Sequence, residues 1–214
     1  YTNPLTGIRV DKLAGVFTSN VGLIQNNTQI TSVRSNGIEI LNTNRMQVKG
    51  NTISHTLYTG TPPVGTQFKG GIGIYLANAQ NCLIKENDVQ LGTTLQDGYT
   101  NGIMSTISPN NTYCCNITSN QREGVRFIGI NNNDYLRHNS LNTHTNGLRI
   151  DEGLIGIQDP LTQIYGLSAN SWNASALTGG FNAFNNTSDQ LMVLSSKIIS
   201  NTCNVPYWPS SISP

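Results

Sequence analysis

The residues best suited to chemistry lie near the middle of the chain, where Arg126, Arg149, Asp151 and Glu152 occur within a short stretch. Guanidinium groups beside carboxylates could bind a polar ligand. Alternatively, the carboxylates could bind a Ca²⁺ ion while an arginine acts as the base. A Ca²⁺ site draws on several acidic oxygen ligands, and this group offers two carboxylates. We therefore predict no metal site and no catalytic residue, and we interpret Asp151 and Glu152 as solvated corner residues. Arg126, Arg149 and Asp151 are kept as candidate ligand-binding residues.

The histidines and the short motifs add no second candidate for catalysis. His55, His138 and His144 lack the helical HExxH spacing of a zinc protease. His138 lies two residues after Leu136 and directly before Asn139, which favours a corner or surface role for His138. No Gly-x-Ser-x-Gly elbow and no phosphate-binding loop occurs. We predict no cofactor.

Three tyrosines are candidates for stacking on sugar rings. Tyr58 and Tyr99 lie in segments rich in Gly, Thr and Pro, and Tyr75 lies in an apolar stretch between them. Aromatic rings on one open face would favour a carbohydrate-binding module. Rings packed against the body of the protein would favour a scaffold.

The composition limits the class of protein. Charged residues make up 11% of the 214 residues and the formal net charge is +1, so no basic patch for nucleic acid is expected. Abundant Asn, Thr, Ser and Gly with few Lys and Glu argue against a helical protein. No apolar run is long enough to span a membrane, and no signal peptide is recognisable.

A glycine followed by alternating apolar residues recurs along the chain. Spacings of 30, 34, 31, 22 and 23 residues separate the openings, which are Gly7, Gly37, Gly71, Gly102, Gly124 and Gly147. A unit of about 22 residues with insertions suits one turn of a parallel β-helix. The alternation predicts that pairs such as Ile38 with Ile40 point inward, and we expect each glycine to supply backbone freedom at a corner.

A second recurring motif places an asparagine between apolar residues. It is clearest in Val48–Ile53, Ile84–Val89 and Leu136–Leu141, and degraded in 113–118. The shared residues are Asn51, Asn87, Asn116 and Asn139. In stacked turns they would lie about 4.8 Å apart and form a ladder of side-chain amides. Ligand binding is the alternative for these residues, and we favour the ladder.

These patterns resemble the right-handed parallel β-helix superfamily, which implies an all-β fold of five or six coils over residues 1–152. A narrower resemblance covers roughly 110–214, to surface and secreted proteins of Bacteroidota exported by the type IX pathway. It is carried by Tyr113–Asn116, Gly124–Gly129, Gly147–Asp151, Ile155–Gln158, Asn170–Trp172 and Pro206–Pro209. The resemblance implies an extracellular or cell-surface location and says little about activity. Enzymes of this fold that cleave acidic polysaccharides typically carry an Asp-Asp pair, a Gly-His-Gly and an Arg-x-Lys, which this sequence lacks.

The remaining segments are predicted to be loops and a cap. Insertions at 54–69 and 90–101 should project from one side, and residues 153–214 should form an irregular C-terminal cap. Cys203 in this cap could bridge to Cys115, with buried thiols as the alternative. Adjacent residues of a strand point to opposite faces, so Cys114 and Cys115 are expected to face apart. The chain starts at Tyr1, without an initiator Met, and we expect a piece of a longer protein.

Three functions remain open from the sequence. The first is a non-catalytic extracellular β-helix module with a structural or adhesive role. Its partners would be other domains of the same surface protein or other proteins. The second is a carbohydrate-binding module, and the third a polysaccharide lyase or glycoside hydrolase. An acidic cleft containing Asp97, Asp151 or Glu152 would favour the third.

Overall fold

The computed structural model describes residues 6–11, 22–32, 36–55, 71–91, 100–153, 155, 170–173 and 181–186, and these contain strands and turns but no helix. The strands are β1 Ile8–Asp11, β2 Gly22–Gln25, β3 Ile30–Ser32, β4 Asn36–Leu41, β5 Met46–Lys49, β6 Thr52–His55, β7 Ile72–Ala77, β8 Leu83–Lys85, β9 Asp88–Leu91, β10 Asn101–Thr106, β11 Thr112–Cys114, β12 Ile117–Ile128, β13 Tyr135–Arg137, β14 Ser140–Asp151, β15 Ser171–Asn173 and β16 Phe181–Asn186.

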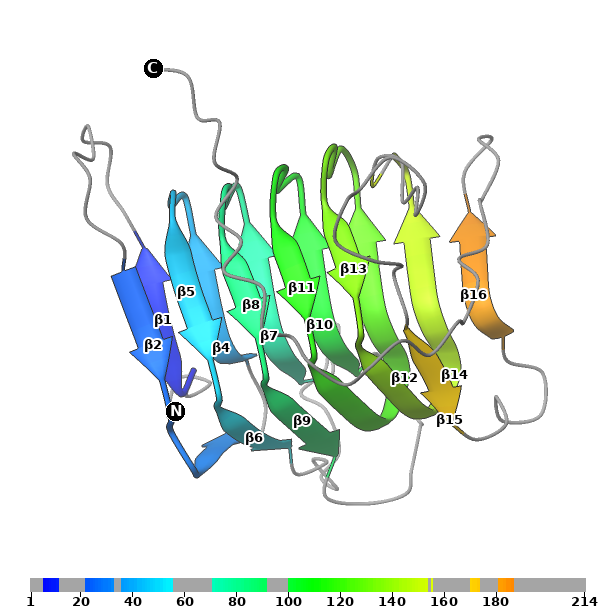
Figure 1. Cartoon of the computed structure of the whole chain (residues 1–214), viewed down its shortest axis with the longest axis horizontal. Coiled ribbons are helices and arrows are strands. Elements are labelled where there is room, and N and C mark those ends of the chain that lie inside the picture. The colour runs from blue at the N-terminus through cyan, green and yellow to red at the C-terminus, as the bar shows by residue number, and fades with distance from the viewer. Residues whose placement is uncertain are drawn as a thin grey trace, which may run out of the picture.

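All paired strands run parallel and belong to two sheets. In the larger sheet, β1, β4, β7, β10, β12, β14 and β16 follow one another, and so do β3, β6, β9, β12, β14 and β15. The 12-residue strands β12 and β14 belong to both series and join them into one strongly curled, half-barrel sheet. The smaller sheet has the order β13-β11-β8-β5-β2. Successive repeats lie side by side along the long axis (Figure 1), an arrangement compatible with a β-helix-like fold.

The register of β7 differs from the predicted one by two residues. Ile38 of β4 pairs with Ile74, so Gly37 is matched by Gly73 rather than by Gly71. Two Gly-Ile steps occur in succession in Gly71-Ile-Gly-Ile, and the sequence alone does not distinguish them. Because of this shift, Tyr75 lies between Glu39 and Met104 on the outer face, in register with both.

The repeat glycines lie against one another near the start of β4, β7 and β10 and within the long strands β12 and β14. A Cβ on Gly37 would lie 2.7 Å from the carbonyl oxygen of Gly73, and a Cβ on Gly124 would lie 2.5 Å from that of Gly147. The φ angles of these glycines are not in the left-handed region. Close approach of neighbouring backbones, and not the expected conformational freedom, therefore requires glycine here.

Apolar side chains at alternate positions fill the interior. Ile38 and Ile40 of β4 are fully buried, as are Ile74 of β7 and Ile103 of β10. Alternation along each strand sends one set inward and leaves the other on the outer face.

Two aromatic rings meet in this interior. The rings of Phe127 and Tyr113 pack edge to face with centroids 5.4 Å apart. Both side chains are almost completely buried. The pair links β12 of the larger sheet to β11 of the smaller one and helps to hold the two sheets together.

An asparagine ladder runs through the bend that follows the smaller sheet. The side-chain oxygen of Asn87 accepts hydrogen bonds from the backbone N–H and the side-chain amide of Asn51, at 3.1 and 2.9 Å. The Asn87 amide in turn donates to Asn116 and to the carbonyl of Val48, both at 2.9 Å. The full ladder comprises Asn27, Asn51, Asn87, Asn116, Asn139 and Asn170. It includes two residues, Asn27 and Asn170, beyond those predicted.

From Asn27 to Asn139, the residue before each ladder asparagine adopts the left-handed conformation. These residues are Asn26, Gly50, Glu86, Cys115 and His138, with φ of 56, 63, 56, 55 and 50°. This conformation turns the chain sharply between two strands that are each nearly extended. The repeated φ places each asparagine amide against the next one in the stack.

Parallel pairing continues into the segment predicted to be an irregular cap. β15 pairs with β14 through Leu141 and Trp172, and β16 pairs with it through Leu148 and Ala183. Asn182 occupies the position of Gly147, so the glycine that marks the other repeats is missing here. Most of the insertions predicted at 54–69 and 90–101, and most of the segment 153–214, lie outside the described residues.

Replacing Phe127 with Ala should lower the free energy of unfolding by about 3–5 kcal/mol, since the change leaves a cavity against Tyr113. The matched control is Ile130→Ala, whose side chain is 57% exposed and should change stability by about 0.5 kcal/mol or less. Chemical denaturation of the three proteins measures the difference. Equal midpoints would contradict the inward position of Phe127.

Replacing Asn87 with Ala should destabilise the protein by about 2–5 kcal/mol, because buried donors of Asn51 lose their acceptor. Asn132→Ala is the control, since Asn132 is exposed. Denaturant midpoints again give the comparison. Similar midpoints for the two variants would show that the asparagine ladder does not stabilise the fold.

Candidate functional site

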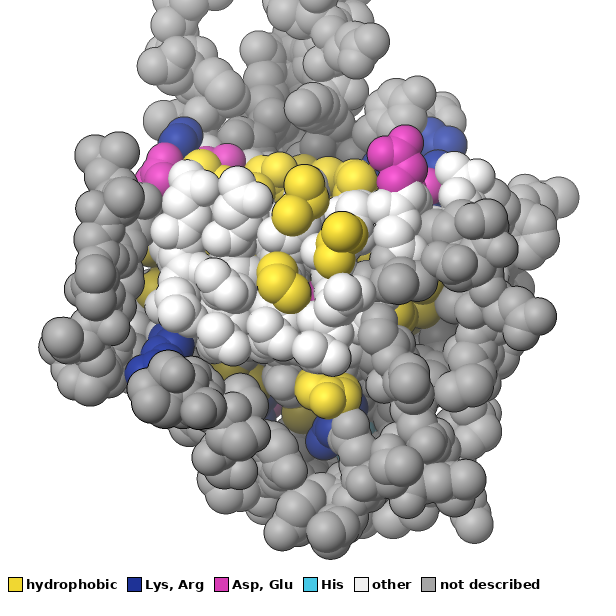
Figure 2. All heavy atoms as spheres, turned by 90° about the horizontal axis from the view of Figure 1, so that it is seen from above, with side chains coloured by type: hydrophobic (Ala, Val, Ile, Leu, Met, Phe, Trp, Pro, Cys, Tyr) yellow, Lys and Arg dark blue, Asp and Glu magenta, His cyan; other side chains and the backbone are white. Residues whose placement is uncertain are grey.

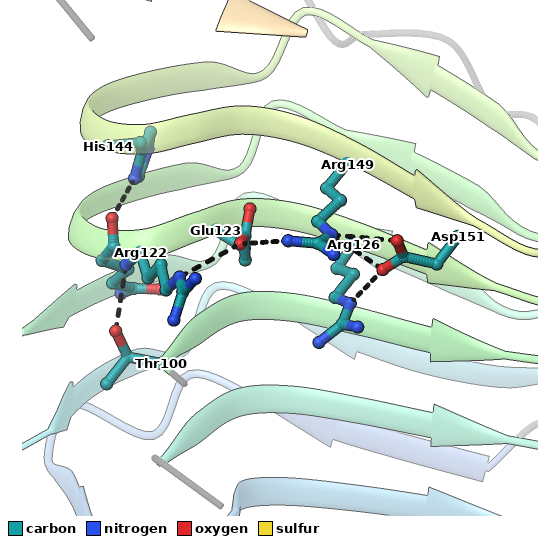
Figure 3. A network of polar contacts seen from close by, with 8 residues as sticks. Thr100, Arg122, Glu123, Arg126, His144, Arg149 and Asp151 are labelled. Carbon is teal, nitrogen blue, oxygen red and sulfur yellow. Dashed lines mark hydrogen bonds and ion pairs between the residues drawn. The ribbon is translucent and has the colours of Figure 1, made fainter. Parts of the chain in front are cut away.

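The charged residues singled out by sequence meet on the outer face of β12 and β14. Arg126 pairs in register with Arg149, and Asp151 follows two residues after Arg149 on the same face. Figure 3 shows both guanidinium groups directed at the Asp151 carboxylate. The two strands thus place residues 25 positions apart in the sequence within hydrogen-bonding distance.

Asp151 is held by both arginines. Its Oδ2 lies 2.7 Å from Arg126 Nε and 2.8 Å from Arg149 Nε, and Asn186 donates to its Oδ1 at 3.2 Å. The Asp151 side chain is only 7% exposed. Burial raises the pKa of this carboxyl, but hydrogen bonds and charges of Arg149 and Arg126 outweigh burial, so the net pKa is lowered. Asp151 is therefore an ionised partner of the two arginines. The interpretation from sequence, that Asp151 is a solvated corner residue, is wrong.

Glu123 joins this cluster and was missed from sequence. Its Oε1 lies 3.3 Å from Arg149 Nη1 and 3.6 Å from Arg122 Nε, and its side chain is 3% exposed. Burial raises the pKa of Glu123, although Asn146 and the nearby arginines lower it in part. One signal was present: other repeats carry Asn before the glycine, as in Asn101 and Asn146, whereas this repeat carries an acid.

The pair of carboxylates deserves comparison with an acid–base site. Burial and charge push the pKa values of Glu123 and Asp151 in opposite directions, which is the pattern of many acid–base pairs. Both carboxylates, however, accept from the same Arg149 guanidinium and are nearly buried. The arrangement is a set of ion pairs that joins β12 to β14. Among the described residues no group of three or more His, Cys, Asp or Glu could hold a metal ion.

The predicted tyrosine platform is described only in part. Tyr75 is partly exposed on the outer face of β7, in the series that continues through Met104 to Arg126. Tyr58 and Tyr99 lie outside the described residues. The structure therefore brings Tyr75 onto the face that carries Arg126 and Arg149, and whether the other two rings share this face stays a prediction.

His144 lies inside the bend of β14. The residue, labelled in Figure 3, is 3% exposed, with Nδ1 3.1 Å from the Gln121 carbonyl oxygen and Nε2 3.2 Å from Thr118 Oγ1 and 3.0 Å from the Thr118 carbonyl oxygen. Both ring nitrogens face carbonyl acceptors, so a neutral ring donates either from Nδ1–H to the Gln121 carbonyl or from Nε2–H to the Thr118 carbonyl, and in the first case Nε2 accepts from the Thr118 hydroxyl. Burial lowers the pKa of His144 to about 4. His144 is thus a structural residue of the interior.

The turns between the two sheets form a face of low charge. Figure 2 shows mainly uncharged polar side chains and backbone there, with small and separate hydrophobic areas. Ile107 and Ile130 lie in two of these turns and are 54% and 57% exposed. Asn110 and Asn133 stack through a 3.0 Å hydrogen bond between their side chains. The visible part of this face offers no continuous apolar area of the kind that marks many protein interfaces.

Cys114 and Cys115 do not face apart as predicted. β11 ends at Cys114, and the φ of 55° at Cys115 swings its side chain back, so that the two sulfurs are 3.8 Å apart. Cys82 and Cys114 carry thiols, and Cys115 takes part in a disulfide. Cys203, the partner predicted for Cys115, lies outside the described residues.

Comparisons with known proteins give no match: no family model, no curated protein and no solved structure is significantly similar to this chain. Within the described ranges, no helix has the length and apolar character needed to cross a membrane.

Stability should depend on pH through His144. The unfolded His144 has a pKa near 6.5 and the folded one about 4, so unfolding takes up a proton between these values and stability falls as pH drops from about 6.5 to about 4. The shift corresponds to about 3 kcal/mol at about 1.4 kcal/mol per pKa unit.

His144→Gln isolates this contribution, because Gln121 holds the equivalent position in the preceding repeat. Unfolding free energies of wild type and variant are measured from pH 4 to pH 8. The difference between the two proteins should be smaller at pH 4 than at pH 8, because only wild type loses stability through His144. Burial raises the pKa of Glu123 and of Asp134 and opposes the trend, but equally in both proteins. Parallel pH profiles would show that His144 is not buried in its neutral form.

Proposed function

We propose that this chain is a rigid, non-catalytic module of a secreted or cell-surface protein, built as a right-handed parallel β-helix of five or six coils. Its role would be structural or adhesive, and its partners other domains of the same protein or other proteins. The right hand is supported by the rule that connections between parallel strands of one sheet are right-handed in about 98% of cases. The sequence resemblance to surface proteins of Bacteroidota exported by the type IX pathway supports the location.

The asparagine ladder is the observation that carries this proposal. From Asn51 to Asn170, each side-chain oxygen accepts two hydrogen bonds from the preceding asparagine, and each side-chain amide also donates to a backbone carbonyl. A buried amide network with its members satisfied favours one conformation over alternatives. Such a column supports a stiff element that keeps its ends a fixed distance apart.

Two further observations support the same role. Arg126 of β12 pairs with Asp151 of β14, and Arg149 of β14 pairs with Glu123 of β12, so the best candidates for chemistry also cross-link the stack. The disulfide at Cys115 is typical of proteins from oxidising compartments, which supports an extracellular location.

A carbohydrate-binding module is the second candidate, and Tyr75 favours it. The partly exposed ring is flanked in register by Glu39 and Met104, with Arg126 one strand further. An aromatic ring beside polar side chains on a flat face could stack on a sugar and orient its hydroxyls. This reading requires affinity for a glycan that depends on Tyr75.

A glycan array with a parallel assay for reducing ends tests the proposal on the purified chain. We expect a folded sample to release no reducing ends from any glycan. Release that is lost in Arg149→Gln or Asp151→Asn would overturn the non-catalytic assignment.

Retention without release would support the second candidate if Tyr75→Ala abolishes it. Tyr135→Ala is the matched control, because Tyr135 is also partly exposed but lies in the smaller sheet, beneath Arg137. Loss of binding in both variants would point to a general loss of structure, which the unfolding midpoint of each variant measures.

A further inference from the structure

The two adjacent cysteines at the bend before Asn116 form an unusual sulfur pair. We propose that Cys114 and Cys115 are an intramolecular thiol–disulfide exchange site, in which the thiol of Cys114 displaces the sulfur now bonded to Cys115. The proposal concerns a change of disulfide partner at the end of β11, and it does not depend on the function proposed above.

Geometry brings the two groups together. The Sγ atoms are 3.8 Å apart, against about 2.05 Å for a disulfide bond. Consecutive strand residues would direct their side chains to opposite faces. The left-handed conformation at Cys115 removes that separation, and the same conformation recurs at this place in the neighbouring repeats because the asparagine ladder follows it. The close approach is therefore fixed by the fold.

The strands on either side place cations next to Cys114. Cys114 pairs in register with Lys85 of β8 and with Arg137 of β13. Burial raises the pKa of Cys114 to about 11, while the charges of Lys85 and Arg137 lower it and that of Glu86 raises it. Glu86 is engaged with Lys85 at 3.2 Å, and His138 occupies the position after Arg137 that corresponds to Cys115. The thiolate is thus a minor form at neutral pH, stabilised by two cations.

The exchange balances without any other reagent. Cys114 loses a proton to solvent, and its thiolate attacks Cys115 Sγ. A Cys114–Cys115 bond forms as the bond from Cys115 to its present partner breaks. The electron pair leaves on the partner sulfur, which becomes a thiolate and takes up a proton. One disulfide and one thiol are present before and after, so no oxidant or reductant is needed. Cys115 stays oxidised throughout.

Cys82 provides an internal comparison. It also carries a thiol, and burial raises its pKa to about 11 as well. The residue is 2% exposed, and its thiol donates to the Gln80 carbonyl at 3.3 Å. Cys82 therefore matches Cys114 in acidity but has a different sulfur environment.

The test follows the bond pattern of the whole chain. Wild type, Cys114→Ser and Cys82→Ser are incubated at pH 7, 8, 9 and 10 without reductant and quenched with acid. Thiols are then alkylated and the peptides are mapped by mass spectrometry. We expect a Cys114–Cys115 linkage, with one newly alkylated cysteine elsewhere, in wild type and Cys82→Ser. Its initial rate should rise about tenfold per pH unit, following the thiolate fraction below a pKa of about 11. Cys114→Ser should show none.

Three results would overturn the proposal. One is the absence of the linkage in wild type up to pH 10. Another is a rate that rises with protein concentration, which would show exchange between molecules. The third is the appearance of a new thiol in Cys114→Ser at the wild-type rate. A folded Cys114→Ala variant, checked by its unfolding midpoint, guards against a loss that merely reflects disruption by serine.

Discussion

The structure depends on satisfying the backbone and side-chain polar groups that each bend would otherwise bury without partners. Backbone groups at a bend pair only in part with the neighbouring repeat, as the Gly50 N–H does with the Lys85 carbonyl, and a buried group left unpaired costs about 1–3 kcal/mol. The asparagine ladder meets this need at one bend: Asn116 accepts from Asn87 and donates to both Asn139 and the carbonyl of Ile84. At the bend within β12 and β14, Gln121 donates to the Val89 carbonyl and His144 contacts the Gln121 carbonyl, while glycine lets neighbouring backbones approach directly, as at Gly102 and Gly124. Two different solutions thus hold the bends of one stack.

Much of this was accessible from the sequence, because stacking demands the same residue type at the same place in each repeat. The spacing of Asn51, Asn87 and Asn139 and the apolar alternation around Ile38 follow from that demand. The predictions that were wrong concern the register of one strand and the conformation of one corner residue. Repeated Gly-Ile steps hid the register of Tyr75. The left-handed corner at Cys115 reversed the expected orientation of its side chain.

The candidate site was harder to predict than the fold for the same physical reason. Outer-face residues need not match between repeats, so their partners follow only from register. Asp151 looked solvated in sequence and is clamped by Arg126 and Arg149 in the structure. Glu123 gave one hint, an acid where other repeats have asparagine. His144 gave none, because its inward position arises from a bend within a single long strand, β14.

Register and corner geometry, more than sequence proximity, therefore decide where chemistry can occur on this scaffold. Charged groups 25 residues apart meet across two strands, and two neighbouring sulfurs meet only because the chain turns between them. The corner that brings Cys114 to Cys115 is the one that the ladder requires at Glu86 and His138 too. A cysteine pair at this place needs no dedicated loop, since the repeat already supplies the turn and the flanking strands supply Lys85 and Arg137. The regular interior fixes such positions, and the few side chains that differ between repeats give them their chemistry.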